Sequence, residues 1–174
     1  YKSYPRIVGE TGGKDYILAD ETANAKQVAT AITRGAFEYQ GQKCSAASRA
    51  YIPVNLWEEI RQYVTEDLTS IRTGVVEDFS NFVNAVIDEE SFDKLAAVID
   101  GASRSPDAEI VCGGTYDKSL GYFIQPTVIL AKKADYITMR EELFGPILTV
   151  YLYEPDKLEE TMNILDTTTD YALT

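Results

Sequence analysis

The sequence predicts an α/β domain with a mostly parallel sheet flanked by helices. Two observations carry this prediction. Short apolar, β-prone runs alternate with segments whose apolar residues recur every three or four positions, and repeated strand–helix alternation is typical of parallel sheets. The run at 147–153, ILTVYLY, is the clearest strand because it combines β-branched and aromatic residues. Reactive side chains are then expected on loops at the strand ends.

Length and charge limit the classes of function. The chain has 174 residues, 45% of them hydrophobic, and a formal net charge of −12, which suits one folded domain. An excess of acidic residues disfavours a nucleic-acid partner, and no apolar run approaches the roughly 18 residues of a membrane span. Because the first residue is not Met and neither end resembles a natural terminus, we expect a piece of a longer chain.

The individual elements follow from local patterns. Apolar periodicity predicts helices, and alternation predicts strands. Proline cannot donate to a strand ladder, so the strand containing Pro126 is assigned to a sheet edge. Helices are expected at 23–39, 56–71, 91–103 and 156–166. Strands are expected at 6–8, 16–19, 49–53, 109–112, 121–130 and 147–153. Residues 72–84 are expected to form a loop with a brief strand at most, and 135–143 a short mixed segment.

The stretch FEYQGQKCSAASR, residues 37–49, is the first candidate site. It places Cys44 in a glycine-led loop followed by small residues, so a substrate could approach the sulfur closely. A thiol is nucleophilic as the thiolate, which nearby positive charge favours, and Lys43 is one local source. The alternative is that Cys44 is a small buried hydrophobe.

The rest of the composition narrows the chemistry. With only two cysteines and no histidine, the sequence contains no Ser-His-Asp triad, Cys-His dyad or usual zinc site. Both cysteines are expected to be reduced, and Cys112 is expected in the core because it ends a strand-like run. Any base in this segment must therefore be a carboxylate or an amine.

Two carboxylates in irregular segments are candidates for that chemistry. Glu10 lies in the turn GETGGK and could take the proton of a water. Glu142, beside Phe144 in REELFGPI, could grip a sugar diol while the ring stacks on a flat cofactor. The alternatives are that Glu10 caps a turn and that Glu141 and Glu142 form a solvated face.

Together these motifs carry a family resemblance. GETGGK, GQKCSAASR and EELFGPIL resemble, in order and spacing, motifs of the aldehyde dehydrogenase superfamily. The resemblance covers essentially the whole chain and implies that residues 1–174 are a single nucleophile-bearing catalytic domain. The dinucleotide-binding domain and the C-terminal tail would lie outside it. Within the superfamily, FEYQGQKCSA, NAVIDEESFDK and GYFIQPTV resemble most the 1-pyrroline-5-carboxylate (glutamate semialdehyde) dehydrogenases, which use NAD in proline catabolism.

The resemblance also implies a role for each matching residue. Cys44 would be the nucleophile and Glu10 the base that activates water. The expected cofactor-binding residues are Glu142, Phe144, Thr11 and Gly12. Ser45 is similar to a substrate-contacting position.

Further expectations concern the parent protein. It would act on a small aldehyde, form a homo-oligomer and reside in the bacterial cytoplasm or the mitochondrial matrix. The segment alone is expected to turn over little or no substrate. Two alternatives stay open, namely another aldehyde dehydrogenase subfamily and a non-catalytic binding module with a structural cysteine.

Overall fold

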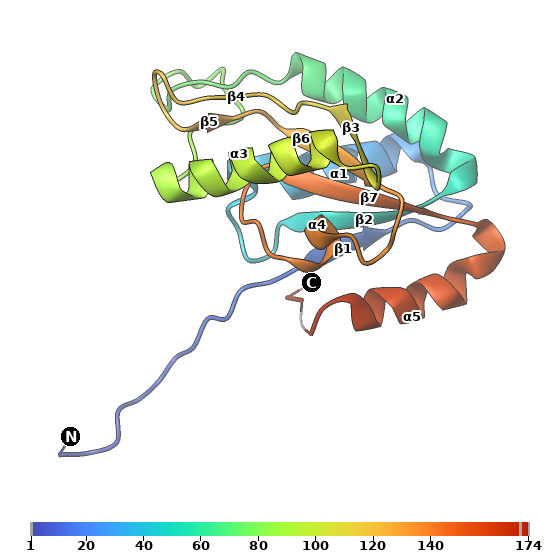
Figure 1. Ribbon diagram of the computed structural model, residues 1–174, viewed down its shortest axis with the longest axis horizontal. Coiled ribbons are helices and arrows are strands. Elements are labelled where there is room, and N and C mark those ends of the chain that lie inside the picture. The colour runs from blue at the N-terminus through green and yellow to red at the C-terminus, as the bar shows by residue number, and fades with distance from the viewer. Residues whose placement is uncertain (1, 171, 174) are drawn as a thin grey trace.

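The computed structural model describes residues 2–170 and 172–173 and shows a sheet with helices on both faces (Figure 1). Among these residues the main sheet has five strands in the order β1-β2-β7-β6-β3. Its strands are β1 (Asp15–Leu18), β2 (Ala47–Pro53), β7 (Ile147–Tyr153), β6 (Thr127–Ala131) and β3 (Ala108–Cys112). All neighbours pair in parallel except β3, which runs antiparallel to β6. The predicted mostly parallel sheet is confirmed.

The helices begin where the sequence offers a capping side chain or an apolar period. Asn24 accepts a hydrogen bond from the backbone N–H of Gln27 at the start of α1, and Asp88 accepts one from Ser91 at the start of α3. The helices are α1 (Ala25–Phe37), α2 (Val54–Ser70), α3 (Glu89–Arg104), α4 (Ile137–Arg140) and α5 (Leu158–Thr168). No helix in the described part of the chain is long and apolar enough to cross a membrane.

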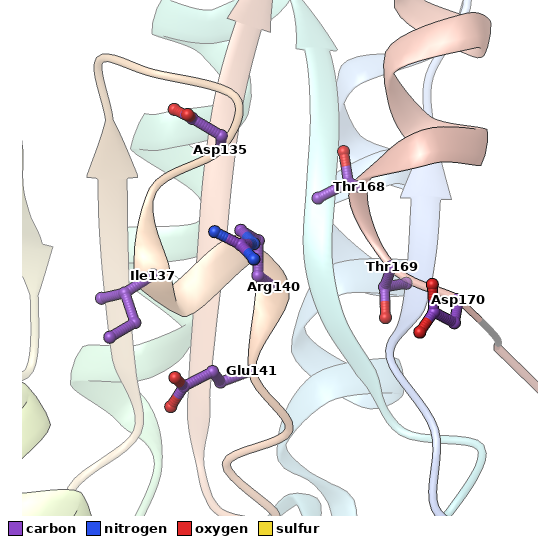
Figure 2. A pocket seen from close by; sticks show the side chains of 7 residues that line it. All are labelled: Asp135, Ile137, Arg140, Glu141, Thr168, Thr169 and Asp170. Carbon is purple, nitrogen blue, oxygen red and sulfur yellow. The ribbon is translucent and has the colours of Figure 1, made fainter.

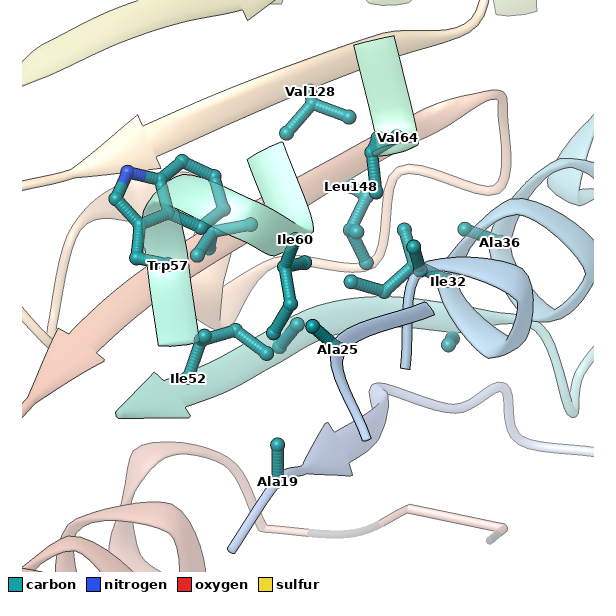
Figure 3. Packing of buried hydrophobic residues seen from close by; sticks show 14 of the residues in the cluster. Ala19, Ala25, Ile32, Ala36, Ile52, Trp57, Ile60, Val64, Val128 and Leu148 are labelled. Atoms are coloured by element: carbon teal, nitrogen blue, oxygen red, sulfur yellow. The ribbon is translucent and has the colours of Figure 1, made fainter. Parts of the chain in front are cut away.

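One face of the sheet packs against α1 and α2 through mainly apolar side chains (Figure 3). Ile32 of α1 and Ile60 of α2 lie over Leu148 of β7, and each is at most 1% exposed. Ala29 and Ala36 let α1 approach the sheet closely. This face is a mainly apolar core, which burial of apolar area stabilises. Thr33 of α1 also donates a hydrogen bond to Asp67 of α2 at 3.0 Å.

The opposite face packs against α3, α4 and α5 and contains buried polar groups. Arg49 of β2 is 1% exposed and donates from Nε to the carbonyl of Lys14 at 2.9 Å. The Thr149 hydroxyl donates to that of Thr138 at 2.7 Å, joining β7 to α4. Met139 and Leu165 supply apolar cover from α4 and α5.

Three expectations about elements were wrong or imprecise. Residues 6–8 form no strand, and Ile7 and Val8 are exposed because no neighbouring strand lies beside them. The strand containing Pro126 is not at an edge. β6 begins after the proline, at Thr127, and therefore pairs on both sides, with β7 and with β3.

The first long helix is shorter than its apolar period suggested. α1 ends at Phe37, and a 3-10 turn at Glu38–Gly41 follows. The segment 72–84 behaves as predicted, with one isolated bridge between Thr73 and Val83. A second, two-stranded sheet pairs β4 (Tyr116–Asp117) with β5 (Phe123–Ile124).

Candidate active site

Three segments far apart in the sequence meet beside the start of β1. The carboxylate Oε1 of Glu142 accepts a hydrogen bond from the backbone N–H of Gly13 at 2.8 Å. A Cβ atom added to Gly12 would lie 2.5 Å from Glu142 Oε2, and one added to Gly13 would lie 2.6 Å from the carbonyl oxygen of Cys44. The glycine pair is therefore needed for close approach, and it joins two of the predicted motifs to the third.

The cysteine loop connects the 3-10 turn after α1 to β2. Cys44 is half-buried and Ser45 is exposed, while Ala46 and Ala47 turn into the protein. A reagent can therefore reach the loop at Cys44 and Ser45. Neither Cys44 nor Cys112 is in a disulfide within the described chain.

The positive charge beside Cys44 is already paired. Lys43 Nζ lies 3.2 Å from Glu38 Oε2, and the same carboxylate contacts Arg34. These two cations lower the pKa of Glu38, with the Lys43 hydrogen bond as the largest cause. Lys43 therefore shares its charge with Glu38, which lies in the 3-10 turn before it, and its influence on the Cys44 thiol stays a prediction.

The loop of Glu142 joins α4 to β7. Its backbone is held from α3, because Lys94 Nζ donates to the carbonyl of Glu142 at 2.8 Å. Phe144 has φ +56° and is 41% exposed. Glu141 faces solvent, whereas the Glu142 carboxylate binds Gly13. The solvated-face alternative therefore describes Glu141 and not Glu142.

Glu10 and Thr11 precede the glycine pair of this junction, and Thr11 is bonded directly to Gly12. The chain before β1 is extended and leaves the body of the protein (Figure 1), and both residues are exposed. Among the described residues, no hydrogen bond or ion pair joins Glu10 to Cys44. The structure thus brings Glu142, Gly12 and Cys44 together and does not add Glu10 to them.

The crevice at this junction is small, and a larger cavity lies elsewhere. A crevice of about 10 Å³ lies between Gly13, Lys43 and Phe144, too small for a substrate. A polar cavity of about 400 Å³ lies between α4 and the end of α5, with the Arg140 guanidinium between Asp135 and the threonines at 168 and 169 (Figure 2). None of the predicted site residues lines it. In the described part of the chain, no group of His, Cys, Asp and Glu could hold a metal ion.

Two charged residues near the junction were not predicted. Lys14, in the GETGGK motif, is 2% exposed, and its Nζ has no hydrogen-bond partner among the described residues. Burial, assisted by Arg49, lowers the pKa of Lys14 to about 7. Lys94 lies among the apolar residues of α3, and nothing in the sequence indicated that it would contact the loop of Glu142. The position of Lys14 directly after two glycines could have suggested a buried role.

Cys112 differs from Cys44 in its surroundings. It ends β3, packs against the α1–α2 core and is half-buried. Burial raises the pKa of the Cys112 thiol. The prediction of a structural residue agrees with this packing.

Comparison with known proteins identifies the family. The family model described as "Aldehyde dehydrogenase family" matches residues 2–174. The chain is 53% identical over its whole length to a protein named delta-1-pyrroline-5-carboxylate dehydrogenase, mitochondrial, from Dictyostelium discoideum, and 42% identical to the human protein of that name. It spans 31% of the length of each.

A solved structure agrees with these sequence matches. The fold superposes with a TM-score of 0.90 on a crystal structure of the Delta-pyrroline-5-carboxylate dehydrogenase from Mycobacterium tuberculosis bound with NAD, at 41% identity over 99% of this chain and 31% of the other. The chain belongs to the aldehyde dehydrogenase family.

Proposed function

We propose that this chain is the nucleophile-bearing part of an NAD-dependent dehydrogenase that oxidises L-glutamate γ-semialdehyde to L-glutamate. This aldehyde is in hydrolytic equilibrium with 1-pyrroline-5-carboxylate in proline catabolism. One observation carries the proposal. The glycine pair of the first motif lies between the Glu142 carboxylate and the main chain of Cys44. The names of the Dictyostelium, human and mycobacterial relatives support the choice of substrate.

Cys44 is the proposed nucleophile. Its thiolate attacks the aldehyde carbon to form a thiohemiacetal, and its own backbone N–H helps to hold the oxyanion. The half-buried position of Cys44 and the exposed position of Ser45 support access by a small aldehyde. Ser45 is the proposed substrate contact. Loss of hydride leaves a thioester on Cys44.

Glu10 is the proposed base for hydrolysis of that thioester. A carboxylate takes a proton from water as the water oxygen attacks the acyl carbon, and the Cys44 thiolate leaves. Glu10 is exposed. A movement of the exposed chain that carries Glu10 would bring this carboxylate towards Cys44.

The residues at the junction fit a nucleotide cofactor. A Cβ at Gly12 would fill the space beside Glu142 Oε2, and the open carboxylate oxygen can accept hydrogen bonds from a ribose diol. Glu142, Phe144, Thr11 and Gly12 are the proposed contacts. NAD, when bound, supplies the hydride acceptor. Because the crevice within this chain is small, these residues are proposed to form one wall of a larger site.

The whole protein is proposed to be a homo-oligomer in which the rest of the chain binds the dinucleotide. The Dictyostelium and human relatives are named as mitochondrial, which supports the mitochondrial matrix for a eukaryotic source. A bacterial source would place the protein in the cytoplasm.

The test uses the full-length protein that contains this chain. NADH absorbance is followed with 1-pyrroline-5-carboxylate and with propionaldehyde. We expect faster turnover of the first substrate and a loss of at least a thousandfold in Cys44→Ala. Cys112→Ala is the matched control and should keep wild-type turnover. Comparable rates on both substrates would contradict the proposed substrate and favour another aldehyde dehydrogenase subfamily.

Two further measurements address the alternatives. Residues 1–174 alone should show little or no turnover, because the cofactor contacts form only one wall of a site. Iodoacetamide should alkylate Cys44 faster than Cys112 in the full-length protein. Equal, slow labelling of both, together with activity in Cys44→Ala, would favour a non-catalytic module.

A further inference from the structure

Two glutamine side chains hold the loop that carries Cys44. Gln42 Oε1 accepts a hydrogen bond from the backbone N–H of Ile87 at 2.9 Å. Gln40 Nε2 donates to the carbonyl of Ala85 at 3.4 Å, a longer and weaker contact. Both contacts link the loop to one segment that lies 45 residues further along the chain. Neither glutamine has a role in the proposed chemistry.

The segment that receives these contacts is firmly anchored. Val86 is 3% exposed and packs with Phe92 and Leu95 of α3. Its backbone N–H donates to the carbonyl of Tyr122 at 2.9 Å. Asp88, which directly follows Ile87, caps the N-terminus of α3. The two glutamines therefore attach the cysteine loop to the start of a packed helix.

The backbone at Gln40 and on either side of it is strained. Tyr39 and Gln40 have φ values of +53° and +57°, a region that residues with a side chain rarely adopt. Gly41, at φ +66°, packs so closely that a Cβ would lie 2.5 Å from the carbonyl oxygen of Gly145. Such conformations persist only where surrounding contacts hold them, and the side chain of Gln40 is itself buried.

We propose that Gln42, supported by Gln40, is a positioning residue for the Cys44 thiol. Its hydrogen bond to Ile87 fixes the loop two residues before the nucleophile. The neighbouring Gly41 sets the distance to the loop that carries Glu142. This inference rests on the proposed function and adds a residue that acts through Cys44 without touching substrate. A misplaced nucleophile slows the chemical step more than it weakens cofactor binding.

The test compares two substitutions in the full-length protein. Gln42→Met keeps the length of the side chain and removes the acceptor. Gln42→Glu keeps an oxygen that can accept from Ile87. Gln62→Met is the matched control, because Gln62 also makes one side-chain hydrogen bond, at 2.9 Å to Glu66 on the exposed face of α2. Gln42→Asn, which is too short to reach, replaces Gln42→Met if that variant does not fold.

Three measurements are made on each variant. Hydrogen–deuterium exchange at residues 85–88 reports the bond itself. The pH profile of iodoacetamide alkylation gives the limiting rate for the Cys44 thiolate, so that the added charge of Gln42→Glu is separated from its effect on loop position. Steady-state kinetics give kcat and the KM for NAD.

In Gln42→Met we expect faster exchange at Ile87, a changed limiting alkylation rate and a fall in kcat of about tenfold, with the KM for NAD within about twofold of wild type. Gln42→Glu should recover most of kcat at high pH. Unchanged exchange, or faster exchange with wild-type kcat and alkylation, would overturn the proposal. Equal loss in both Gln42 variants would overturn it too. If wild-type turnover survives Cys44→Ala, the proposed function fails, and exchange and alkylation still decide the role of Gln42.

Discussion

The two faces of the sheet are built on different principles. On the α1–α2 face, apolar side chains such as Ile60 and Leu148 supply most of the packing against the sheet. On the α3–α5 face, the same strands bury Arg49 and Thr149 under α4 and α5, beside Lys14. The loop of Glu142 follows α4, one of the helices that cover this second face. Both faces thus bury apolar clusters, and the second face also bears the cost of burying charged groups near the proposed site.

The largest difference between the faces should appear on titration. The pKa of Lys14 in the folded chain, about 7, lies below its unfolded value of 10.5. Between these values the unfolded chain binds more protons, so the free energy of unfolding should rise as pH increases from about 7 to 10.5. The full effect is at most about 5 kcal/mol, since each pKa unit corresponds to about 1.4 kcal/mol.

Lys14→Met should remove this slope. Urea unfolding of the 174-residue chain at several pH values would measure it. Lys26→Met, at an exposed position on α1, should keep the wild-type slope. An identical pH dependence in Lys14→Met and wild type would show that Lys14 is charged and stably accommodated in the fold.

Substitutions on the α1–α2 face should lower stability strongly, and the loss should not depend on pH. Ile60 is fully buried, and Ile60→Ala should lower the free energy of unfolding by about 2–5 kcal/mol because it removes packed atoms and leaves a cavity. Val54→Ala, at a 39% exposed position in the same helix, should cost much less. Chemical denaturation at pH 6 and 9 would give the same loss if the contrast between the faces is correct.

A smaller effect is expected for the neutral polar pair. Thr149→Val removes the hydroxyl that bonds Thr138 at 2.7 Å in the buried layer. We expect a loss of about 1–2 kcal/mol, because the Thr138 hydroxyl then stays buried without that partner. The double variant with Thr138→Val should recover part of it. Additive losses in the double-mutant cycle would mean that the two hydroxyls do not depend on each other.

The smallest effect should come from the exposed rim. Arg104 lies 3.8 Å from Asp100 on α3, and both side chains are largely in solvent. Arg104→Ala should change the free energy of unfolding by less than about 0.5 kcal/mol, and added salt should reduce even that. A loss of stability comparable to that of Thr149→Val would contradict this prediction, because it would mean that the exposed Arg104–Asp100 pair contributes as much as a buried hydrogen bond.

Much of the fold followed from local pattern. The long helices and the strand at Ile147–Tyr153 appear where periodicity placed them, because each buries one face or one apolar run. The errors arose where the pairing of strands decides whether and where a strand forms. A strand at 6–8 has suitable residues and no partner, and β6 avoids the restriction of Pro126 by starting one residue later. Pairing partners are not encoded in a local window.

The candidate site divides in the same way. The sequence by itself determined which residues are candidates for the chemistry, because a cysteine among small residues and two carboxylates in glycine-flanked turns can be recognised from residue type and order. Only the tertiary structure decided what each of them contacts. Glu142 meets Gly13 across 129 positions and Gln42 meets Ile87 across 45. Such contacts depend on strand register and helix packing, which are properties of the whole fold.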